Sequence, residues 1–285
     1  MLRQELAALG VPCRVRCQAR VASTQDLVLA AARAGAPEGL VITAEHQTLG
    51  RGRAGRRWTD SPGTSLMFSM LWRPARPPTE WGTLALTAGL AVAEGMEAAG
   101  GPRVELKWPN DCLTAGRKLA GILVESGPGG GPPAAVVGVG CNVAWAGVDP
   151  GLVAGATALD LEGTPIPITA LAVAVLASLH RRYREWIEGG FHPMLPAWTG
   201  RCQWLGQLVA VKLPEGLVEG ELLGLAPNGA LRLGRDGLEI EVPAGDVGPV
   251  GAPSLRLAGE HGAAIGPSGL TTAEVGSRME TFAQE

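Results

Sequence analysis

The sequence has no long apolar run, so it offers no segment suited to crossing a membrane. No stretch approaches the ~20 apolar residues that a helix needs to span a bilayer. The first ten residues also lack the basic region and apolar core of a signal peptide. We therefore expect neither membrane insertion nor secretion.

Cysteine is scarce as well. The five cysteines are scattered along the chain and odd in number. Cys13 and Cys17 have a spacing that zinc ligands use, but no second cysteine or histidine pair follows to complete four ligands. The pattern favours a reduced, cytoplasmic protein without a structural metal, and it identifies no metal ligands.

Positive charge is not in excess. The chain carries 24 lysines and arginines against 27 acidic residues, for a formal net charge of −3. No overall positive field therefore attracts nucleic acid or an anionic membrane. Hydrophobic residues make up 46% of the 285 residues and charged residues 18%, which is typical of a globular protein.

Helix and strand patterns alternate through the first two thirds of the chain. Helices are expected at residues 23–34, where Ser23 and Asp26 fit a capping box, and at 80–99, 168–187 and 193–199. Strands are expected at residues 40–45, 65–72, 103–108, 118–126 and 134–143. The short connection between the last two strands indicates an antiparallel pair. The fold class is α+β, with a mixed, largely antiparallel sheet and flanking helices.

The sequence pattern changes near residue 206, from long helices and strands to short strands. Short strands at 208–213, 220–225, 230–233 and 238–242 are separated by glycine, proline and Asn-Gly turns, as in a small β-barrel. Beyond residue 250 the periodicity fades. We expect a catalytic domain over 1–203, a small barrel over 204–250 and a flexible tail over 251–285.

Residues 50–58 read Gly-Arg-Gly-Arg-Ala-Gly-Arg-Arg-Trp, the most distinctive segment of the chain. Three glycines permit positive φ and could turn N–H groups toward one anion, as in a backbone nest. Four arginines add permanent charge with planar donors suited to phosphate. Because like charges repel, we expect a loose loop that orders when an anion binds. The segment also matches G-x-G-x-x-G, but no helix start or acidic residue follows at the dinucleotide positions.

Two further segments carry weaker signals. Residues 107–111, Lys-Trp-Pro-Asn-Asp, precede Lys118, which opens an apolar strand where its ammonium needs an anionic partner. Gly121 would leave room for a ligand against that strand. Residues 138–142, Gly-Val-Gly-Cys-Asn, place two glycines in a strand, which indicates close approach of a ligand or a neighbouring element. Taken alone, either segment could be structural.

In this order, the motifs from Ser23 to Asn142 resemble those of the biotin protein ligases. The resemblance implies that family's mixed sheet with flanking helices and a small SH3-like C-terminal barrel. It implies Lys118, Arg53 and Arg51 as catalytic residues. It implies that the residues around biotin and its adenylate are Ser23, Thr24, Gln25, Gln47, Gly50, Arg51, Gly52, Arg53, Lys118 and Gly121.

The resemblance also suggests an ATP side of the site, formed by Arg56, Trp58, Lys107, Asn110, Asp111 and Asn142. Trp58 could pack on adenine, while Asp111 either serves this site or makes an Asx turn. The reaction implied is ATP-dependent activation of biotin to biotinyl-5′-AMP, with Mg²⁺ carried by ATP and no prosthetic group, followed by transfer to a lysine. The acceptor is a biotin carboxyl carrier protein or domain.

Only 22 residues precede Ser23, too few for a three-helix DNA-reading module. We therefore expect the form of the family without DNA binding; a homodimer is left open. Two alternatives remain. One is a lipoate-type protein ligase, although no Arg-Arg-x-x-Gly-Gly-Gly segment is present. The other is a biotin-binding regulator without enzymatic activity, which the intact Lys118 argues against.

Overall fold

The computed structural model describes residues 2–127, 133–145, 155–252 and 255. Residues up to 255 belong to one compact unit. The tail expected over 251–285 falls almost wholly outside the described residues, so that expectation remains a prediction.

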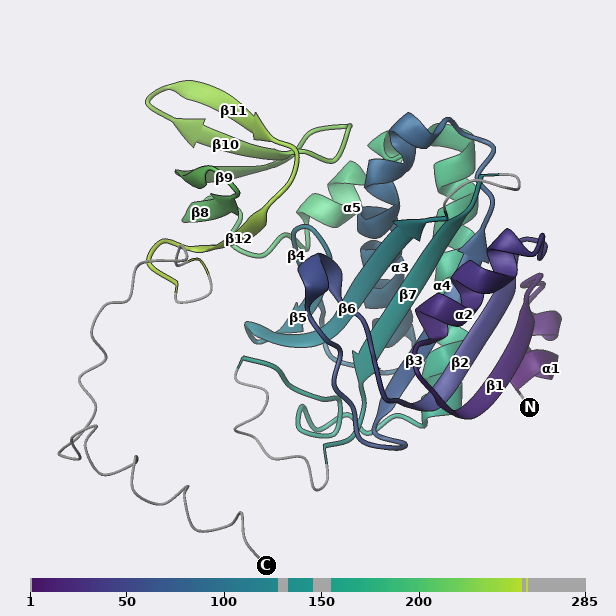
Figure 1. The fold of residues 1–285 in the computed structure, drawn as a ribbon. Coiled ribbons are helices and arrows are strands. Elements are labelled where there is room, and N and C mark those ends of the chain that lie inside the picture. Colours follow the sequence, from purple (N-terminus) through teal and green to yellow (C-terminus); the bar gives the residue numbers. More distant parts are fainter. Residues whose placement is uncertain (1, 128–132, 146–154, 253–254, 256–285) are drawn as a thin grey trace, which may run out of the picture. The chain divides into compact units, whose positions relative to one another are not determined.

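A seven-stranded sheet forms the centre of the larger region, in the order β1-β2-β3-β7-β6-β5-β4 (Figure 1). Only β1 and β2 are parallel; every other neighbouring pair is antiparallel. The expectation of a mixed, largely antiparallel sheet is confirmed. The strands are β1 Arg14–Val21, β2 Leu40–Gln47, β3 Ser65–Trp72, β4 Glu105–Lys107, β5 Asp111–Thr114, β6 Arg117–Ser126 and β7 Ala135–Asn142.

Helices cover both faces of this sheet (Figure 1). They are α1 Leu2–Ala8, α2 Thr24–Arg33, α3 Leu84–Ala98, α4 Ile168–Gly189 and α5 Leu195–Thr199. Helices α3 and α4 pack against each other and share one large core with the sheet, whereas α2 packs against a smaller cluster that includes Leu71 and Val136. Every residue of β3 is buried because the strand is covered on both faces.

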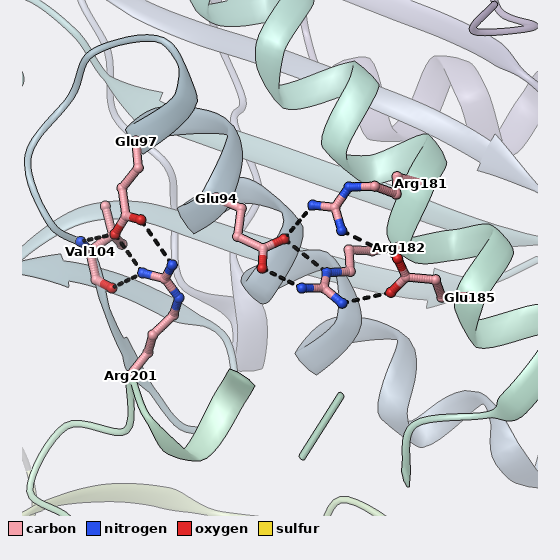
Figure 2. Close-up of polar contacts among 7 residues, drawn as sticks. All are labelled: Glu94, Glu97, Val104, Arg181, Arg182, Glu185 and Arg201. Atoms are coloured by element: carbon pink, nitrogen blue, oxygen red, sulfur yellow. Dashed lines mark hydrogen bonds and ion pairs between the residues drawn. The ribbon is translucent and has the colours of Figure 1, made fainter. Parts of the chain in front are cut away.

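Arginine–glutamate pairs hold the surface of α3 to its neighbours (Figure 2). Glu94 accepts from Arg181 Nη2 at 2.7 Å and from Arg182 Nε at 2.8 Å. Glu97 accepts from Arg201 Nη2 at 2.8 Å and from the Val104 N–H at 2.9 Å. These bonds tie α3 to α4 and to the start of the C-terminal region.

The C-terminal region is a five-stranded antiparallel sheet in the order β11-β10-β9-β8-β12. Its strands are β8 Leu208–Leu213, β9 Gly216–Leu225, β10 Leu231–Arg235, β11 Leu238–Val242 and β12 Asp246–Pro249. In the residues described, no ladder joins β11 to β12, so the sheet is open. Closure into a barrel is not confirmed and stays a prediction.

The C-terminal sheet is anchored through Trp108, which lies between β4 and β5. Its indole Nε1 donates to the Gly229 carbonyl at 3.0 Å, and both groups are buried. Gly229 has φ +86°, and a Cβ there would lie 2.8 Å from Leu86 Cδ1. Glycine is therefore needed at the tip of this turn, which inserts against the start of α3.

Several element boundaries differ from expectation. Helix α3 starts at Leu84 because Pro78–Thr83 form a 3-10 helix before it. Asp111 is not a turn residue; it begins β5 and pairs with both Lys107 and Gly121. Helix α1 and strands β1, β5 and β12 were not expected.

Candidate functional site

A cavity of about 130 Å³ opens above β3, β7 and β6, beside the N-terminus of α2 and the loop that follows β2. Thirteen of the sixteen predicted site residues line it: Ser23, Thr24, Gln25, Gln47, Arg51, Gly52, Arg53, Arg56, Trp58, Asn110, Asp111, Lys118 and Gly121. Gly50, Lys107 and Asn142 do not. The lining residues that the prediction omitted are Arg57, Phe68, Ser69, Ile122, Leu123, Gly138, Val139 and Gly140.

One end of the cavity is polar and uncharged, and the start of α2 places its side chains. Ser23 caps the helix, and its hydroxyl accepts from the Asp26 N–H at 3.5 Å. Thr24 donates its backbone N–H to Gln47 Oε1 at 2.8 Å, and its hydroxyl lies 3.1 Å from the same oxygen. The helix start and the end of β2 are thereby joined through two predicted residues.

Ser69 of β3 links this network to the sheet. Its hydroxyl lies 2.9 Å from Thr24 Oγ1 and donates to Gln25 Oε1 at 2.9 Å, while Gln25 Nε2 donates to the Val136 carbonyl at 3.1 Å. A Cβ on Gly138 would lie 2.6 Å from Gln25 Oε1, so this glycine makes room for the amide. Ser69 was missed because a single serine within an apolar strand carries little signal, although burying a hydroxyl requires a partner.

The arginine loop is a tight hairpin. The Trp58 N–H donates to the Gly50 carbonyl at 3.0 Å, and the Gly52 N–H donates to the Arg56 carbonyl at 2.7 Å. Of the three glycines only Gly55 has positive φ, and the left-handed turn also includes Ala54. The Gly52 and Trp58 N–H groups thus bond within the loop, and an anion nest formed by the loop stays a prediction. Gly50 instead permits close backbone contact, because a Cβ there would lie 2.4 Å from the Trp58 carbonyl oxygen.

Three of the four arginines of this loop pair with carboxylates brought from distant segments. Arg51 donates to Asp26 Oδ1 and Glu125 Oε1, each at 2.6 Å. Arg53 and Arg56 both bind Asp246, the first residue of β12. In this structure these carboxylates offset the repulsion between the guanidinium groups. Ordering of the loop when an anion binds stays a prediction.

Trp58 lies across a pair of glycines on adjacent strands. Gly121 of β6 is the register partner of Gly140 of β7. A Cβ on Gly140 would come within 2.6 Å of Trp58 Cε2, and one on Gly121 would lie 3.4 Å from Cζ3 of the same ring. The space over Gly121 that we assigned to a ligand is thus occupied by the indole. Its Nε1 is buried and has no hydrogen-bond partner among the described residues.

Lys118 projects beside the loop and is held at both ends. Its Nζ lies 2.6 Å from Asp111 Oδ1, and its side chain remains 35% exposed. Its backbone pairs with residues 155–157: the Lys118 N–H donates to the Gly155 carbonyl, and the Lys118 carbonyl accepts from the Thr157 N–H, each at 2.8 Å. The ammonium is therefore available at the cavity while the backbone is fixed.

Three residues of the predicted ATP side have other contacts. Asn110 lines the cavity, but its amide donates to the Ile122 carbonyl at 2.7 Å and fixes β6. Asn142 is buried and donates to the Thr157 carbonyl at 2.9 Å, so it holds the segment beside Lys118. Lys107 lies over the ring of Trp204, with Nζ 5.5 Å from the centroid.

The charged end of the cavity is strongly cationic. Burial lowers the pKa of Lys107; Asp111 opposes this, whereas Lys118, Arg56 and Arg53 lower it further. Burial also lowers the pKa of Arg53, with a further decrease from Arg56 and an opposing increase from Asp111. An anion placed here would relieve this repulsion, so the site suits a phosphate-bearing ligand.

The cavity therefore places an uncharged hydrogen-bonding end next to a cationic end. Among the described residues, no group of three or more His, Cys, Asp or Glu side chains could hold a metal ion. Asp111 is the one carboxylate in the cavity lining described, and it is paired with Lys118. This donor set fits Mg²⁺ that is bound mainly by nucleotide phosphates better than Mg²⁺ held in a protein cage. The same part of the chain contains no helix long and apolar enough to cross a membrane.

Comparison with known proteins agrees with this geometry. Residues 17–142 match the model of the Biotin/lipoate A/B protein ligase family. The chain is 37% identical over 256 residues to a biotin–[acetyl-CoA-carboxylase] ligase of Mycobacterium tuberculosis, covering 86% of this chain and 93% of that protein. It is 33% identical over 217 residues to the bifunctional ligase/repressor BirA of Bacillus spizizenii, covering 75% of this chain and 67% of that protein.

The fold is also similar to that of a biotin protein ligase from Aquifex aeolicus, solved in complex with biotin and ATP. The TM-score is 0.71 at 27% identity, and the match covers 82% of this chain and 97% of that one. Together with the motifs gathered at the cavity, these matches place the sequence: the chain belongs to the biotin protein ligase family.

Proposed function

We propose that the protein activates biotin with ATP to form biotinyl-5′-AMP and transfers the biotinyl group to a lysine of a biotin carboxyl carrier domain. The observation that carries this proposal is the division of one cavity into an uncharged polar end and a cationic end. A small acid with a neutral, hydrogen-bonding head and a carboxylate that must meet a phosphate fits that division.

The neutral end suits the ureido ring of biotin. Thr24, Gln25, Gln47 and Ser69 bear hydroxyl and amide groups that both donate and accept, as a ring with two N–H donors and a carbonyl acceptor requires. Ser23 shapes this end through the cap of α2. Their mutual hydrogen bonds fix the side chains in advance, which lowers the entropy cost of binding.

The cationic end suits the reaction. One carboxylate oxygen of biotin attacks the α-phosphorus of ATP, a P–O bond forms, and pyrophosphate leaves with the electrons of the broken bond. Of the three residues expected to be catalytic, Arg53 and Lys118 keep that role, because their charges reduce repulsion between the two anions. Arg51 acts instead as a positioning residue, which fixes the loop through Asp26 and Glu125. No base is needed, since the carboxylate of biotin is already ionised. Mg²⁺ enters with ATP and neutralises phosphate charge when bound.

The second step transfers the acyl group. The neutral amine of the carrier lysine attacks the carbonyl carbon of the adenylate and a C–N bond forms. The C–O bond to the phosphate breaks, AMP leaves with its electrons, and the amine nitrogen loses one proton to water. The adenylate is prone to hydrolysis, so we assign to the hairpin and Trp58 the task of excluding water until the carrier arrives. Gly50, Gly52 and Gly121 serve this arrangement through backbone contact rather than by binding the ligand.

The proposal extends to the setting of the enzyme. We assign the C-terminal sheet to the small SH3-like domain of the family, over residues 204–250, packed on a catalytic domain over 1–203. We place the enzyme in the cytoplasm, with a carrier domain rather than DNA or a membrane as its partner. The edge strand β1 could also pair with a second copy, which is the homodimer that the resemblance leaves open.

The test is biotin-dependent exchange of labelled pyrophosphate into ATP, followed by incubation with biotin, ATP and an isolated carrier domain. We expect exchange with biotin and a mass gain of one biotinyl group on one carrier lysine. Lipoate in place of biotin is the control. Exchange with lipoate but not with biotin would assign the protein to the lipoate-type ligases and refute the proposal.

A further inference from the structure

The C-terminal sheet contacts the arginine loop through one carboxylate, that of Asp246. Arg53 Nη2 binds Asp246 Oδ1 and also donates to the Gly245 carbonyl at 2.7 Å. Arg56 Nη2 donates to Asp246 Oδ1 at 3.0 Å and to Oδ2 at 2.8 Å. Two guanidinium groups separated by two residues in the loop thus share a single acid located 190 residues further along the chain.

The backbone holds this acid in place. Asp246 pairs with Lys212 at the start of the β8–β12 ladder. The preceding Gly245 has φ +148°, and a Cβ there would lie 2.5 Å from Val211 Cγ1. Only glycine fits this close approach, so the start of β12 is pressed against β8. The carboxylate is therefore presented from a fixed strand end rather than from a mobile loop.

The local charge is unbalanced even with Asp246 present. Five cationic residues line the cavity: Arg51, Arg53, Arg56, Arg57 and Lys118. Four carboxylates pair with them: Asp26 and Glu125 with Arg51, Asp111 with Lys118, and Asp246 with Arg53 and Arg56. Positive charge remains in excess, which favours binding of an anion without displacing any of these acids.

Asp246 and Gly245 bind only one of the three guanidinium nitrogens of Arg53. Its Nη2 is committed to Asp246 and Gly245, whereas its Nε is buried and has no partner within the described part of the chain. A guanidinium has five N–H donors in a rigid fork, so one edge can be fixed by an acid while another binds a phosphate oxygen. Asp246 therefore does not have to leave when ligand binds.

We propose that Asp246 is a positioning residue of the catalytic site, which holds Arg53 and Arg56 side by side so that both bind the phosphates of ATP. The inference rests on the proposed function and adds a role for the C-terminal sheet: it supplies the acid that orients the loop. The uncharged end of the cavity does not depend on Asp246, because its contacts come from α2, β2 and β3.

The test compares Asp246→Asn with wild type and with Asp236→Asn. Asn keeps the shape of the side chain and removes its charge. Asp236 lies in the β10–β11 turn of the same sheet, its side chain is 88% exposed, and asparagine tolerates its left-handed φ of 53°. Pyrophosphate exchange gives KM for ATP and for biotin separately, and calorimetry gives the Kd of biotin in the absence of ATP. Asp246→Glu tests for rescue, and Arg56→Gln provides a background in which one partner is missing.

We expect Asp246→Asn to raise KM for ATP about tenfold, with the Kd of biotin and the Tm close to wild type. Asp246→Glu should recover part of the loss, Asp236→Asn none of it, and Asp246→Asn should add little on the Arg56→Gln background. An unchanged KM for ATP, a lowered one, or an equal rise for biotin would overturn the inference. If wild type shows no biotin-dependent exchange, the proposed function fails instead.

Discussion

The indole of Trp58 lies on Gly140, close enough that a single added Cβ would come within 2.6 Å of Trp58 Cε2. The ring is carried by the arginine loop and the glycine by a central strand of the sheet. Because Gly121 is the register partner of Gly140, the two strands offer a flat strip of backbone to the ring. The position of Trp58, and with it that of the loop, thus depends on Gly140 of β7 having no side chain.

Gly140→Ala should displace this ring and weaken ligand binding. Neither the buried backbone of β7 nor the indole can yield by several tenths of an ångström without moving the loop, and such overpacking costs about 1–3 kcal/mol. We expect biotin affinity to fall about tenfold or more, measured by calorimetry. Gly89→Ala in α3 is the control, because its Cβ would lie 3.9 Å from its nearest neighbours. Equal biotin affinity for Gly140→Ala and wild type would contradict this role for Trp58.

Ser69→Ala should affect the uncharged end of the cavity and leave the cationic end intact. It removes the hydroxyl between Thr24 and Gln25, and both of these side chains are buried. Gln25 Oε1 loses its hydrogen-bond donor, whereas the Thr24 hydroxyl keeps its contact with Gln47. Leaving one buried acceptor without a partner costs about 1–3 kcal/mol in stability. Urea unfolding should show this loss, and KM for biotin should rise while KM for ATP stays constant. Ser178→Ala, a buried serine of α4 outside the cavity lining, should leave both KM values unchanged.

Patterns along the chain identified most elements of the sheet, and the exceptions have a physical reason. Strand β3 was predicted with its observed bounds because all of its residues are buried, which gives a continuous apolar run, and Pro74 follows the strand. Strand β1 was missed because Val15 is its one buried residue, which leaves no alternation to detect. Strand β12 was missed because four residues are too few to show a periodic pattern.

In the candidate site, features that are local in the sequence were predicted, and contacts between distant segments were not. The loop with Arg51 and Arg53 was found because its composition is unusual over nine residues. Its partners Asp26, Glu125 and Asp246 were not found. These single acids are spread over 220 residues, and nothing in the sequence shows that they lie close together in space. Repulsion was inferred from local charge alone, and the tertiary ion pairs that offset it could not be predicted from the loop sequence.

Glu94→Gln should destabilise the fold in a pH-dependent way. Burial alone would raise the pKa of Glu94, but the hydrogen bonds and charges of Arg182 and Arg181 hold it below its ordinary value. A carboxyl group with a depressed folded-state pKa stabilises the protein above its unfolded-state pKa. That contribution is lost as pH falls toward the folded-state value.

We therefore expect the variant to lose about 1–3 kcal/mol of unfolding free energy at pH 7, measured by urea denaturation. The difference from wild type should shrink as the pH is lowered below the ordinary glutamate range. Glu188→Gln is the matched control, since its side chain is 71% exposed and its partner Arg184 lies 3.7 Å away. A difference that stays constant with pH would show that packing, and not the ionised carboxylate, accounts for the effect.

Lys118→Ala should abolish most of the chemistry while sparing the fold. The ammonium is partly exposed at the cavity and paired with Asp111, and the backbone of the residue is held by Gly155 and Thr157 whatever its side chain. Removing one charge aimed at a transition state costs about 100- to 1000-fold in rate. We expect pyrophosphate exchange to fall by that factor at saturating biotin and ATP, with Tm little changed. Arg235→Ala, an exposed cation of the C-terminal sheet, controls for net charge. Exchange that survives in Lys118→Ala would remove this lysine from the catalytic group and leave the hairpin arginines as the main source of positive charge at the reacting phosphate.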